Sequence, residues 1–315
     1  MALETHPCSP KKPPSSAPAE RVEVSVLLGW RQDMLRLGGE PSSFDWLLDG
    51  AGGLNSWQLR SLLIQRTGQV DLRCSRSDIE RLWRRHLAEF VPLQYLMGRC
   101  WWRNFELAVG PSVLIPRPET EQMIDLALAK MQKAQQLESP DMPSSTVWAD
   151  LGTGSGCLAM GLAQALPTSE GLAVDISPAA LSQAHQNLRQ ANLLSQVRLI
   201  EGHWFEPLRP WWGHIELVVA NPPYIPSQEI EDLDPIVRDH EPRLALDGGN
   251  DGLSALEQIA KQAPIALAPG GFLVVEHHHN QSEQVLQLLA THGLVDGAGH
   301  RDLEGQKRFA SARKP

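Results

Sequence analysis

The chain has 315 residues, of which 42% are hydrophobic and 21% charged, and its formal net charge is -9 at pH 7. This composition is ordinary for a soluble globular protein, and the length suffices for about two domains. No apolar run approaches the ~18 residues needed to cross a bilayer, and the N-terminus lacks the order of a secretory signal, so we expect a cytoplasmic protein without a membrane partner.

The four cysteines are widely scattered and form no C-x-x-C pair. This spacing argues against both a disulfide framework and a zinc site. The run His277-His278-His279 does not change this expectation, because adjacent residues on a strand point to opposite faces and chelate poorly together. We therefore expect reduced thiols and no metal site.

Residues 1–20 are rich in proline and serine, which predicts a disordered tail. Residues 21–95 have apolar side chains at helical spacing, as in Ile79, Leu82 and Trp83, and Ser77 with Glu80 matches a capping box. The segment is predicted to be a small helical bundle with a core that includes Trp30, Trp46, Trp57 and Trp83; the alternative is that these tryptophans form a binding surface. Because it holds no catalytic constellation, it is interpreted as a substrate-recognition domain.

Residues 96–116 are punctuated by glycine and proline and are predicted to be a connector with a hairpin around 104–109. From 117 to 315, strands and helices alternate, which predicts an α/β domain with a doubly wound, mainly parallel sheet. The expected strands are Val147–Leu151, Gly171–Asp175, Val197–Ile200, Ile215–Ala220 and Gly271–Glu276. The expected helices begin at Cys157 and Pro178 and lie near 253–267 and 282–290, and the residues beyond Gly293 could add an antiparallel edge.

A glycine-rich loop follows the first of these strands and opens a helix. Its G-x-G-x-G spacing is typical of a nucleotide-binding turn but can also be purely structural. The loop residues are Gly152, Thr153, Gly154, Ser155 and Gly156.

Asp175 ends the second strand, where its carboxylate could accept hydrogen bonds from both ribose hydroxyls of an adenosine cofactor; the alternative is a helix cap. Trp204 follows the third strand, where its flat ring could cover an adenine or belong to the core. Together these residues indicate a cofactor that carries adenosine.

The sequence Asn221-Pro222-Pro223-Tyr224 follows the fourth strand directly. Two prolines make a rigid turn and leave backbone carbonyls without a local N–H partner, so the turn suits the capture of a planar NH2 group. Such a group is a weak nucleophile, and catalysis on it depends mainly on alignment. Because all four segments follow parallel strands, we expect them to meet at one edge of the sheet and to support methyl transfer from S-adenosylmethionine.

With this constellation the chain resembles the class I S-adenosylmethionine-dependent methyltransferases. The resemblance implies a Rossmann-like, mainly parallel seven-stranded sheet. Upstream, residues 92–98 (PLQYLMG) and 113–121 (VLIPRPETE) resemble signatures of the release factor glutamine methyltransferases, and this resemblance runs from about Val22 to the C-terminus. It implies N5-methylation of the glutamine in the Gly-Gly-Gln loop of class I peptide chain release factors, with the N-terminal domain gripping the release factor.

By this resemblance, residues 152–156 would line the methionine and ribose part of the cofactor, Asp175 would hold the ribose and Trp204 would flank the adenine. Asn221 would also border the cofactor. The Asn221 amide oxygen and the Pro222 carbonyl would accept the two N–H bonds of the substrate amide, with Pro223 in the same turn and Tyr224 packing around the glutamine. Arg117 and Glu119 are either substrate-loop contacts or a local ion pair. Ala220, His203 and residues 276–279 depart from the family pattern without removing a proposed contact.

Three other interpretations stay open. A ribosomal-protein glutamine methyltransferase would share the catalytic half, and an adenine-N6 nucleic acid methyltransferase would share the Asn-Pro-Pro-Tyr motif. Residues 96–315 hold 16 Lys and Arg against 26 Asp and Glu, which disfavours nucleic acid as substrate because a duplex-binding face is normally basic. The third is a catalytically silent adaptor that binds cofactor, against which the intact motif speaks.

Overall fold

The computed structural model describes residues 18–135 and 146–315. The chain divides into two compact units, Met1–Arg99 with Pro235–His240 (unit 1) and Cys100–Asp234 with Glu241–Pro315 (unit 2). The inclusion of Pro235–His240 in unit 1 was not anticipated from the sequence. Of the tail expected over residues 1–20, residues 1–17 lie outside the described residues, and the predicted limits at 1–20, 21–95, 96–116 and 117–315 stay predictions.

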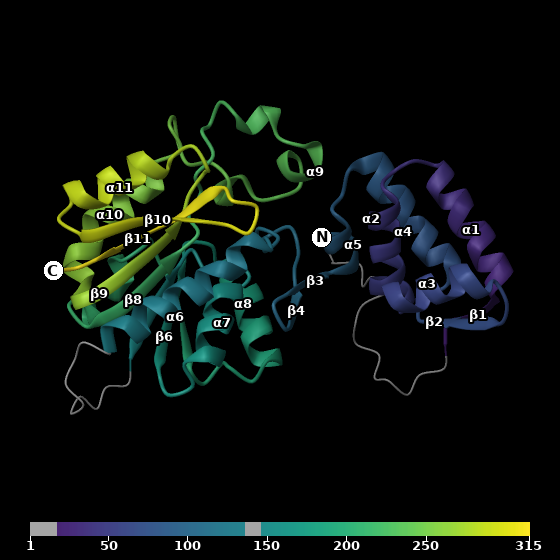
Figure 1. Cartoon of the computed structure of the whole chain (residues 1–315), viewed down its shortest axis with the longest axis horizontal. Helices are drawn as coiled ribbons and strands as arrows, with labels where there is room; N and C mark the ends of the chain where they lie inside the picture. Colours follow the sequence, from purple (N-terminus) through teal and green to yellow (C-terminus); the bar gives the residue numbers. More distant parts are fainter. Residues whose placement is uncertain (1–17, 136–145) are drawn as a thin grey trace. The chain divides into compact units, whose positions relative to one another are not determined.

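Unit 1 is mainly helical and carries a small two-stranded sheet (Figure 1). Strands β1 (Glu20–Glu23) and β2 (Gln69–Leu72) pair antiparallel. Sequence reasoning missed them because each is only four residues long and largely polar. The helices are α1 (Val24–Arg36), α2 (Pro41–Leu47), the π-helical turn η1 (Leu48–Gly52), α3 (Ser56–Gln65), α4 (Arg76–Glu89) and α5 (Leu93–Met97).

The core of unit 1 contains three of the four predicted tryptophans. Trp83 is fully buried and donates from Nε1 to the Met34 carbonyl at 3.1 Å, while Trp30 and Trp46 pack against the core from its rim. The prediction for Trp57 is wrong, because this side chain is 75% exposed. Helix α3 buries a narrow stripe, and Trp57 falls outside it.

The predicted cap of α4 is wrong by two residues. The helix begins at Arg76, and Ser75 caps it by accepting a hydrogen bond at its Oγ from the Asp78 N–H at 3.2 Å. Ser75 and Ser77 are both good capping residues, so local propensity alone does not separate them. The predicted hairpin is confirmed, with β3 (Arg99–Trp102) and β4 (Phe105–Ala108) forming a two-stranded sheet.

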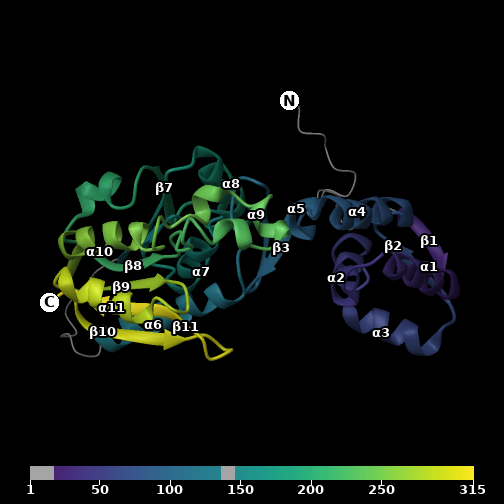
Figure 2. The same cartoon turned by 90° about the horizontal axis from the view of Figure 1, so that it is seen from above.

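Unit 2 is built on a seven-stranded sheet in the order β10-β11-β9-β8-β5-β6-β7, which confirms the predicted fold class (Figure 1). Five strands run parallel, namely β5 (Val147–Leu151), β6 (Glu170–Asp175), β7 (Val197–Glu201), β8 (Ile215–Ala220) and β9 (Leu267–Glu276). Strand β11 (Lys307–Arg313) runs antiparallel to both β9 and the edge strand β10 (Val295–Arg301). Seen from above, β10 and β11 lie at one edge of unit 2 (Figure 2).

Helices cover the sheet of unit 2. Helices α6 (Gln122–Gln135) and α7 (Cys157–Ala165) contact each other, α8 (Pro178–Gln190) contacts β6 and β7, and α10 (Ser254–Ala266) contacts α11 (Ser282–Thr291). A buried cluster joins alternate strand residues, such as Val218 and Leu273, to Ile259 of α10 and Val285 of α11. Full burial of such a side chain stabilises the fold by roughly 1.5–3 kcal/mol, so this cluster fixes the sheet that carries the site.

Shorter segments complete the architecture, namely η2 (Glu119–Glu121), η3 (Glu206–Trp211), η4 (Ile230–Asp232) and η5 (Arg243–Ala245) in unit 2 and α9 (Pro235–Arg238) in unit 1. Among the described helices, none has the length and hydropathy needed to span a bilayer. Cys100 and Cys157 are buried free thiols, as expected, whereas Cys8 lies outside the described residues.

Candidate active site

The glycine loop connects β5 to α7 and forms one wall of a cavity of about 440 Å³ in unit 2. Gly152 and Gly154 have φ angles of 75° and 54°, a left-handed conformation that side chains disfavour, and both line the cavity with Thr153 and Ser155. Gly156 does not line it. A Cβ at Gly156 would lie 3.1 Å from the Cβ of Ala184, so this glycine instead allows α7 to begin close to α8.

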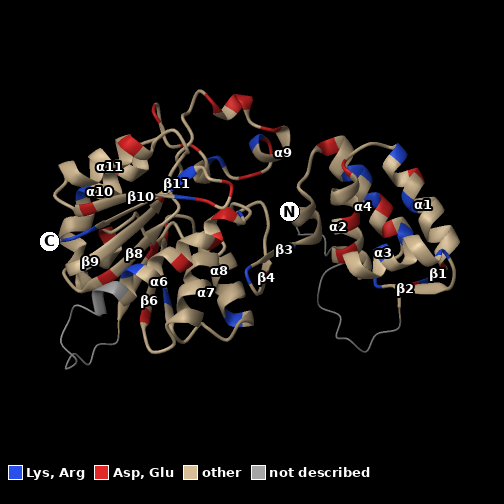
Figure 3. Ribbon diagram, in the orientation of Figure 1, with Lys and Arg blue, Asp and Glu red and all other residues tan. Residues whose placement is uncertain are grey.

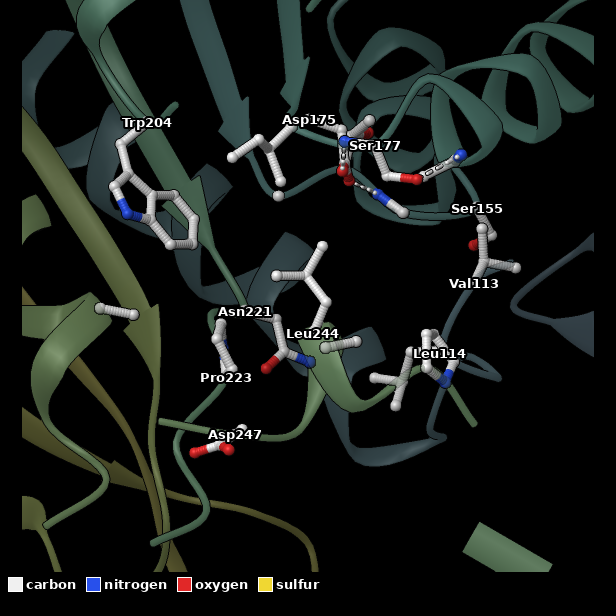
Figure 4. Close-up of a pocket in the computed structure, with 18 of the residues that line it drawn as sticks. Val113, Leu114, Ser155, Asp175, Ser177, Trp204, Asn221, Pro223, Leu244 and Asp247 are labelled. Carbon is white, nitrogen blue, oxygen red and sulfur yellow. Dashed lines mark hydrogen bonds between the residues drawn. The ribbon is translucent and has the colours of Figure 1, made fainter. Parts of the chain in front are cut away.

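Asp175 lies at the end of β6 and contributes to the same cavity (Figure 4). Its Oδ2 accepts from the Gly154 N–H at 2.8 Å and its Oδ1 from the Ser177 N–H at 2.9 Å. Burial raises the pKa of Asp175, and these backbone donors oppose the rise. A carboxylate has about four acceptor positions, so Asp175 is held in place and can still accept from a ligand. The capping alternative fails, because Ser177 caps α8 through the Ala180 N–H.

Trp204 follows β7 and lines the cavity as a flat apolar wall (Figure 4). Its φ of 48° is unusual for a large side chain and stores backbone strain at the site. The indole lies over the glycine loop, since a Cβ at Gly152 would be 3.3 Å from its Cζ3. The ring also packs against the sheet core, so the two interpretations of Trp204 from the sequence describe two sides of one ring.

Asn221 begins the loop after β8, and its side chain projects into the cavity (Figure 4). Its Nδ2 lies 3.4 Å from the Thr120 Oγ1, a long hydrogen bond. Pro223 also lines the cavity, whereas Pro222 and Tyr224 are not among its lining residues. The Tyr224 ring packs on the sheet core, and its hydroxyl donates to the Glu276 Oε1 at 3.0 Å.

The loop 247–252 and the Gln281 side chain pack against the backbone of the Asn-Pro-Pro-Tyr segment. Gln281 donates from Nε2 to the carbonyls of Tyr224 at 3.1 Å and of Asp251 at 3.2 Å. A Cβ at Gly252 would lie 2.2 Å from the Tyr224 carbonyl oxygen, and one at Gly248 would lie 2.8 Å from the Pro223 oxygen. The turn is therefore fixed by close backbone packing that only glycine permits.

Arg117 lines the cavity and forms an ion pair, but with Glu241 rather than with Glu119. Its Nη2 donates to the Glu241 Oε1 at 2.6 Å, and the Glu241 Oε2 accepts from the Ile115 N–H at 3.2 Å. The Glu241 side chain is only 1% exposed. The pair joins the loop before η2 to the segment before η5, a connection that sequence spacing cannot reveal.

No group of three His, Cys, Asp or Glu side chains within the described residues is arranged to hold a metal ion. His277 directs Nδ1 to the His278 carbonyl, and His278 directs Nδ1 to the Asn280 Oδ1. The expectation of no metal site stays a prediction.

Several lining residues were missed by sequence reasoning. Three of them lie in the segment 113–121, which the sequence analysis used only for the family resemblance, and the others lie in or beside η5 and at the start of α10, where no motif or spacing marks them. The missed residues include Val113, Leu114, Thr120, Leu244, Asp247, Ser254 and Gln258.

Residues 128–249 match the family model described as "Methyltransferase small domain". The chain is 46% identical over 289 residues to a release factor glutamine methyltransferase of Prochlorococcus marinus, which covers 92% of this chain and 96% of the relative. It is 42% identical over 286 residues to the protein of the same name from Synechocystis, covering 90% and 93%. A Geobacter sulfurreducens relative of that name is 36% identical over 293 residues, covering 92% and 96%.

Among solved structures, the hMettl16 catalytic domain in complex with MAT2A 3'UTR hairpin 6 shares the fold, with a TM-score of 0.51 and 12% sequence identity. The match covers 79% of this chain and 84% of that one. At this identity the likeness concerns the fold alone. The sequence relatives are close enough and long enough to decide the family, and this chain belongs to the release factor glutamine methyltransferases.

Proposed function

We propose that this methyltransferase transfers a methyl group from S-adenosylmethionine to the side-chain N5 of the glutamine in the Gly-Gly-Gln loop of class I peptide chain release factors. The observation that carries the proposal is the placement of the Asn221 amide in the same cavity as the glycine loop, Asp175 and Trp204. The substrate follows from the names of the relatives.

The residues around the cavity fit the proposed cofactor. Asp175 offers a fixed carboxylate for two ribose hydroxyls, and Trp204 offers an apolar face for an aromatic base. Gly152 and Gly154 have no side chains, so the backbone can approach the ligand closely. Thr153 and Ser155 complete this wall. When bound, S-adenosylmethionine supplies a methyl group on a positively charged sulfur.

Asn221 is proposed to act by alignment. Its amide oxygen and the Pro222 carbonyl accept the two N–H bonds of the substrate amide, and this directs the nitrogen toward the methyl group. No strong base is needed beforehand, because the positive charge that develops on the nitrogen makes its proton acidic. Orientation of this kind can supply several kcal/mol of the barrier reduction.

Pro223 and Tyr224 are proposed to keep this turn in shape. Pro223 lines the cavity beside Asn221, and the Tyr224 ring anchors the turn to the sheet core. Tyr224 is also proposed to pack around the glutamine, while its hydroxyl donates to the Glu276 Oε1.

Unit 1 is proposed to recognise the release factor. It has a core of its own, and α3 leaves Trp57 and Ile64 exposed at 75% and 82%. Exposed large apolar side chains on one helix are typical of surfaces that contact other proteins. Since release factors act on ribosomes, we propose that the protein works in the cytoplasm.

The nucleic acid alternative is less well supported. Acidic and basic residues are interspersed over the helices of unit 2, and acidic residues are in excess in the sequence 96–315 (Figure 3). A nucleic acid methyltransferase would need a basic surface to displace counterions and room for a flipped base.

The test is to incubate the purified protein with methyl-labelled S-adenosylmethionine and a class I release factor. We expect label on the intact release factor and none when the loop glutamine is replaced by alanine. A ribosomal protein and duplex DNA, supplied separately, serve as competing substrates. Label on either of these instead, or on no substrate, would contradict the proposal.

A further inference from the structure

Behind Asn221, a chain of hydroxyl and carboxylate groups crosses from the η2 segment to the end of β9. Thr120 donates from Oγ1 to the Glu276 Oε2 at 2.7 Å, and the Tyr224 hydroxyl donates to the Glu276 Oε1 at 3.0 Å. Asn221 Nδ2 lies 3.4 Å from the Thr120 Oγ1. Thr120 and Glu276 are 2% and 1% exposed, so water has little access to these hydrogen-bonded groups.

With Glu276 ionised, the donors and acceptors in this chain of hydrogen bonds can be assigned. An ionised carboxylate only accepts, so each hydroxyl that meets Glu276 must use its single hydrogen on it. Burial raises the pKa of the Tyr224 phenol, and the neighbouring Glu276 raises it further, so this hydroxyl keeps its hydrogen. Burial also raises the pKa of Glu276, while the two hydroxyls and the charge of Arg308 favour its ionised form.

With its hydrogen directed at Glu276, the Thr120 oxygen can only accept from its other neighbour. An amide oxygen in that position would meet another oxygen without a hydrogen between them, which costs free energy at a buried site. The Asn221 NH2 group must therefore face Thr120. Its carbonyl oxygen then faces the cavity, which is the orientation needed to accept an N–H bond.

We propose that Thr120 and Glu276 are positioning residues that fix which way round the Asn221 amide is presented to substrate. This inference rests on the proposed function, because it assigns the origin of the amide orientation that methyl transfer requires. Neither residue belongs to the Asn-Pro-Pro-Tyr motif, and they lie 101 and 55 residues from Asn221 in the sequence.

Thr120→Val keeps the shape of the side chain and removes the hydroxyl, so it is the central variant. We expect kcat for the release factor to fall about 10- to 100-fold, because a misplaced group costs factors of this size. The Kd for cofactor should stay unchanged, since the glycine loop and Asp175 are untouched. Thr120→Ser restores the hydroxyl and should recover kcat.

Glu276→Gln should also lower kcat, because an amide can donate to Thr120 and so reverse its hydrogen bond. The variant that combines Thr120→Val with Glu276→Gln should lose no more kcat than the worse of the two single variants, because both changes break the same series of hydrogen bonds. Ser311→Ala is the matched control, since it removes another buried hydroxyl of the same sheet, one that contacts His300. It should leave kcat unchanged whatever it does to the melting temperature.

A direct readout does not need the release factor. The side-chain NH2 signals of Asn221 in a 15N NMR spectrum, identified by their loss in Asn221→Ala, should shift in Thr120→Val and stay in place in Ser311→Ala. Unshifted signals in Thr120→Val, or wild-type kcat in that variant, would overturn the inference. If wild-type protein fails to methylate the release factor, the proposed function fails, and the NMR result still decides the orientation.

Discussion

Asp150 is a buried carboxyl that the proposed mechanism does not use. It precedes the glycine loop in β5, and its Oδ2 accepts from the Thr153 Oγ1 at 2.6 Å and the Ala159 N–H at 3.1 Å. Within the described part of the chain its Oδ1 has no hydrogen-bond partner. Burial raises the pKa of Asp150 from 3.8 to about 7, against the effect of the two donors.

This pKa predicts a dependence of stability on pH. The folded chain holds the Asp150 proton more tightly than the unfolded chain does, so its contribution to stability is complete below pH 3.8 and is lost as pH rises through about 7. An amide side chain cannot titrate, so Asp150→Asn should gain melting temperature relative to wild type between about pH 5 and pH 8. We expect a few degrees, since ~1 kcal/mol shifts the midpoint by about 2–4 °C in chains of this size.

Asp71→Asn is the control for that measurement. Hydrogen bonding to Arg21 lowers the pKa of Asp71 from 3.8, so its titration is complete below the tested interval. The difference in melting temperature between Asp71→Asn and wild type should be flat across it. A flat difference for Asp150→Asn as well would show that the Asp150 pKa is not raised.

Some residues of the site could be predicted from the sequence and others could not. Asp175, Trp204 and Asn221 could be chosen in advance because each follows a recognisable strand, and all three line the cavity. Leu244 could not, since it is 61% exposed and lies in the short segment η5, which has no recognisable sequence pattern. The partner of Arg117 is 124 residues away, a separation over which spacing carries no information.

At the scale of elements, the α/β rhythm was readable because buried parallel strands are continuous apolar runs and helices are periodic. Strands β5 and β8 have the predicted bounds, and Ser177 caps α8 as predicted. Strand β9 starts at Leu267, four residues before the expected Gly271, because pairing with β8 extends it through the Pro-Gly segment. Short polar strands such as β1 become stable only through tertiary pairing, so the sequence does not reveal them.

The junction of α7 with α8 gives a prediction about Gly156. Its φ is 83° and a Cβ would crowd Ala184, so Gly156→Ala should destabilise the fold by about 1–3 kcal/mol. Because Gly156 does not line the cavity, the loss of stability in thermal unfolding should exceed any loss of cofactor affinity in calorimetry.

Gly29→Ala is the matched control, since Gly29 lies in α1 with nothing within 4 Å of an added Cβ. It should stabilise the fold by about 0.5–1 kcal/mol through helix propensity. If Gly156→Ala left the melting temperature unchanged and weakened cofactor binding, Gly156 would be a direct cofactor contact.

At the scale of the whole molecule, the two units divide the proposed work. Unit 2 contains every lining residue of the cavity, and unit 1 has a separate core built around Trp83. The sequence indicated this division through its change from helical spacing to an α/β rhythm. It could not indicate that Pro235–His240 would join unit 1, because that contact depends on tertiary structure.

This division predicts that KM differs between the whole release factor and an isolated peptide that contains the Gly-Gly-Gln loop. Under the proposed recognition role, the peptide lacks the parts of the release factor that unit 1 would bind, so it should have a much higher KM. Steady-state kinetics on both substrates would measure the effect. Equal kcat/KM values for the two substrates would contradict a recognition role for unit 1.

The central claim is that Asn221 aligns the substrate amide and does not hold the cofactor. The most direct test is a single-turnover measurement of methyl transfer to the release factor by Asn221→Ala, with cofactor and substrate saturating. The account predicts a rate loss of about 10²–10³, the size seen when one aligned hydrogen-bonding group is removed, with an unchanged cofactor Kd. Turnover near the wild-type rate, or a loss explained by weaker cofactor binding, would contradict it.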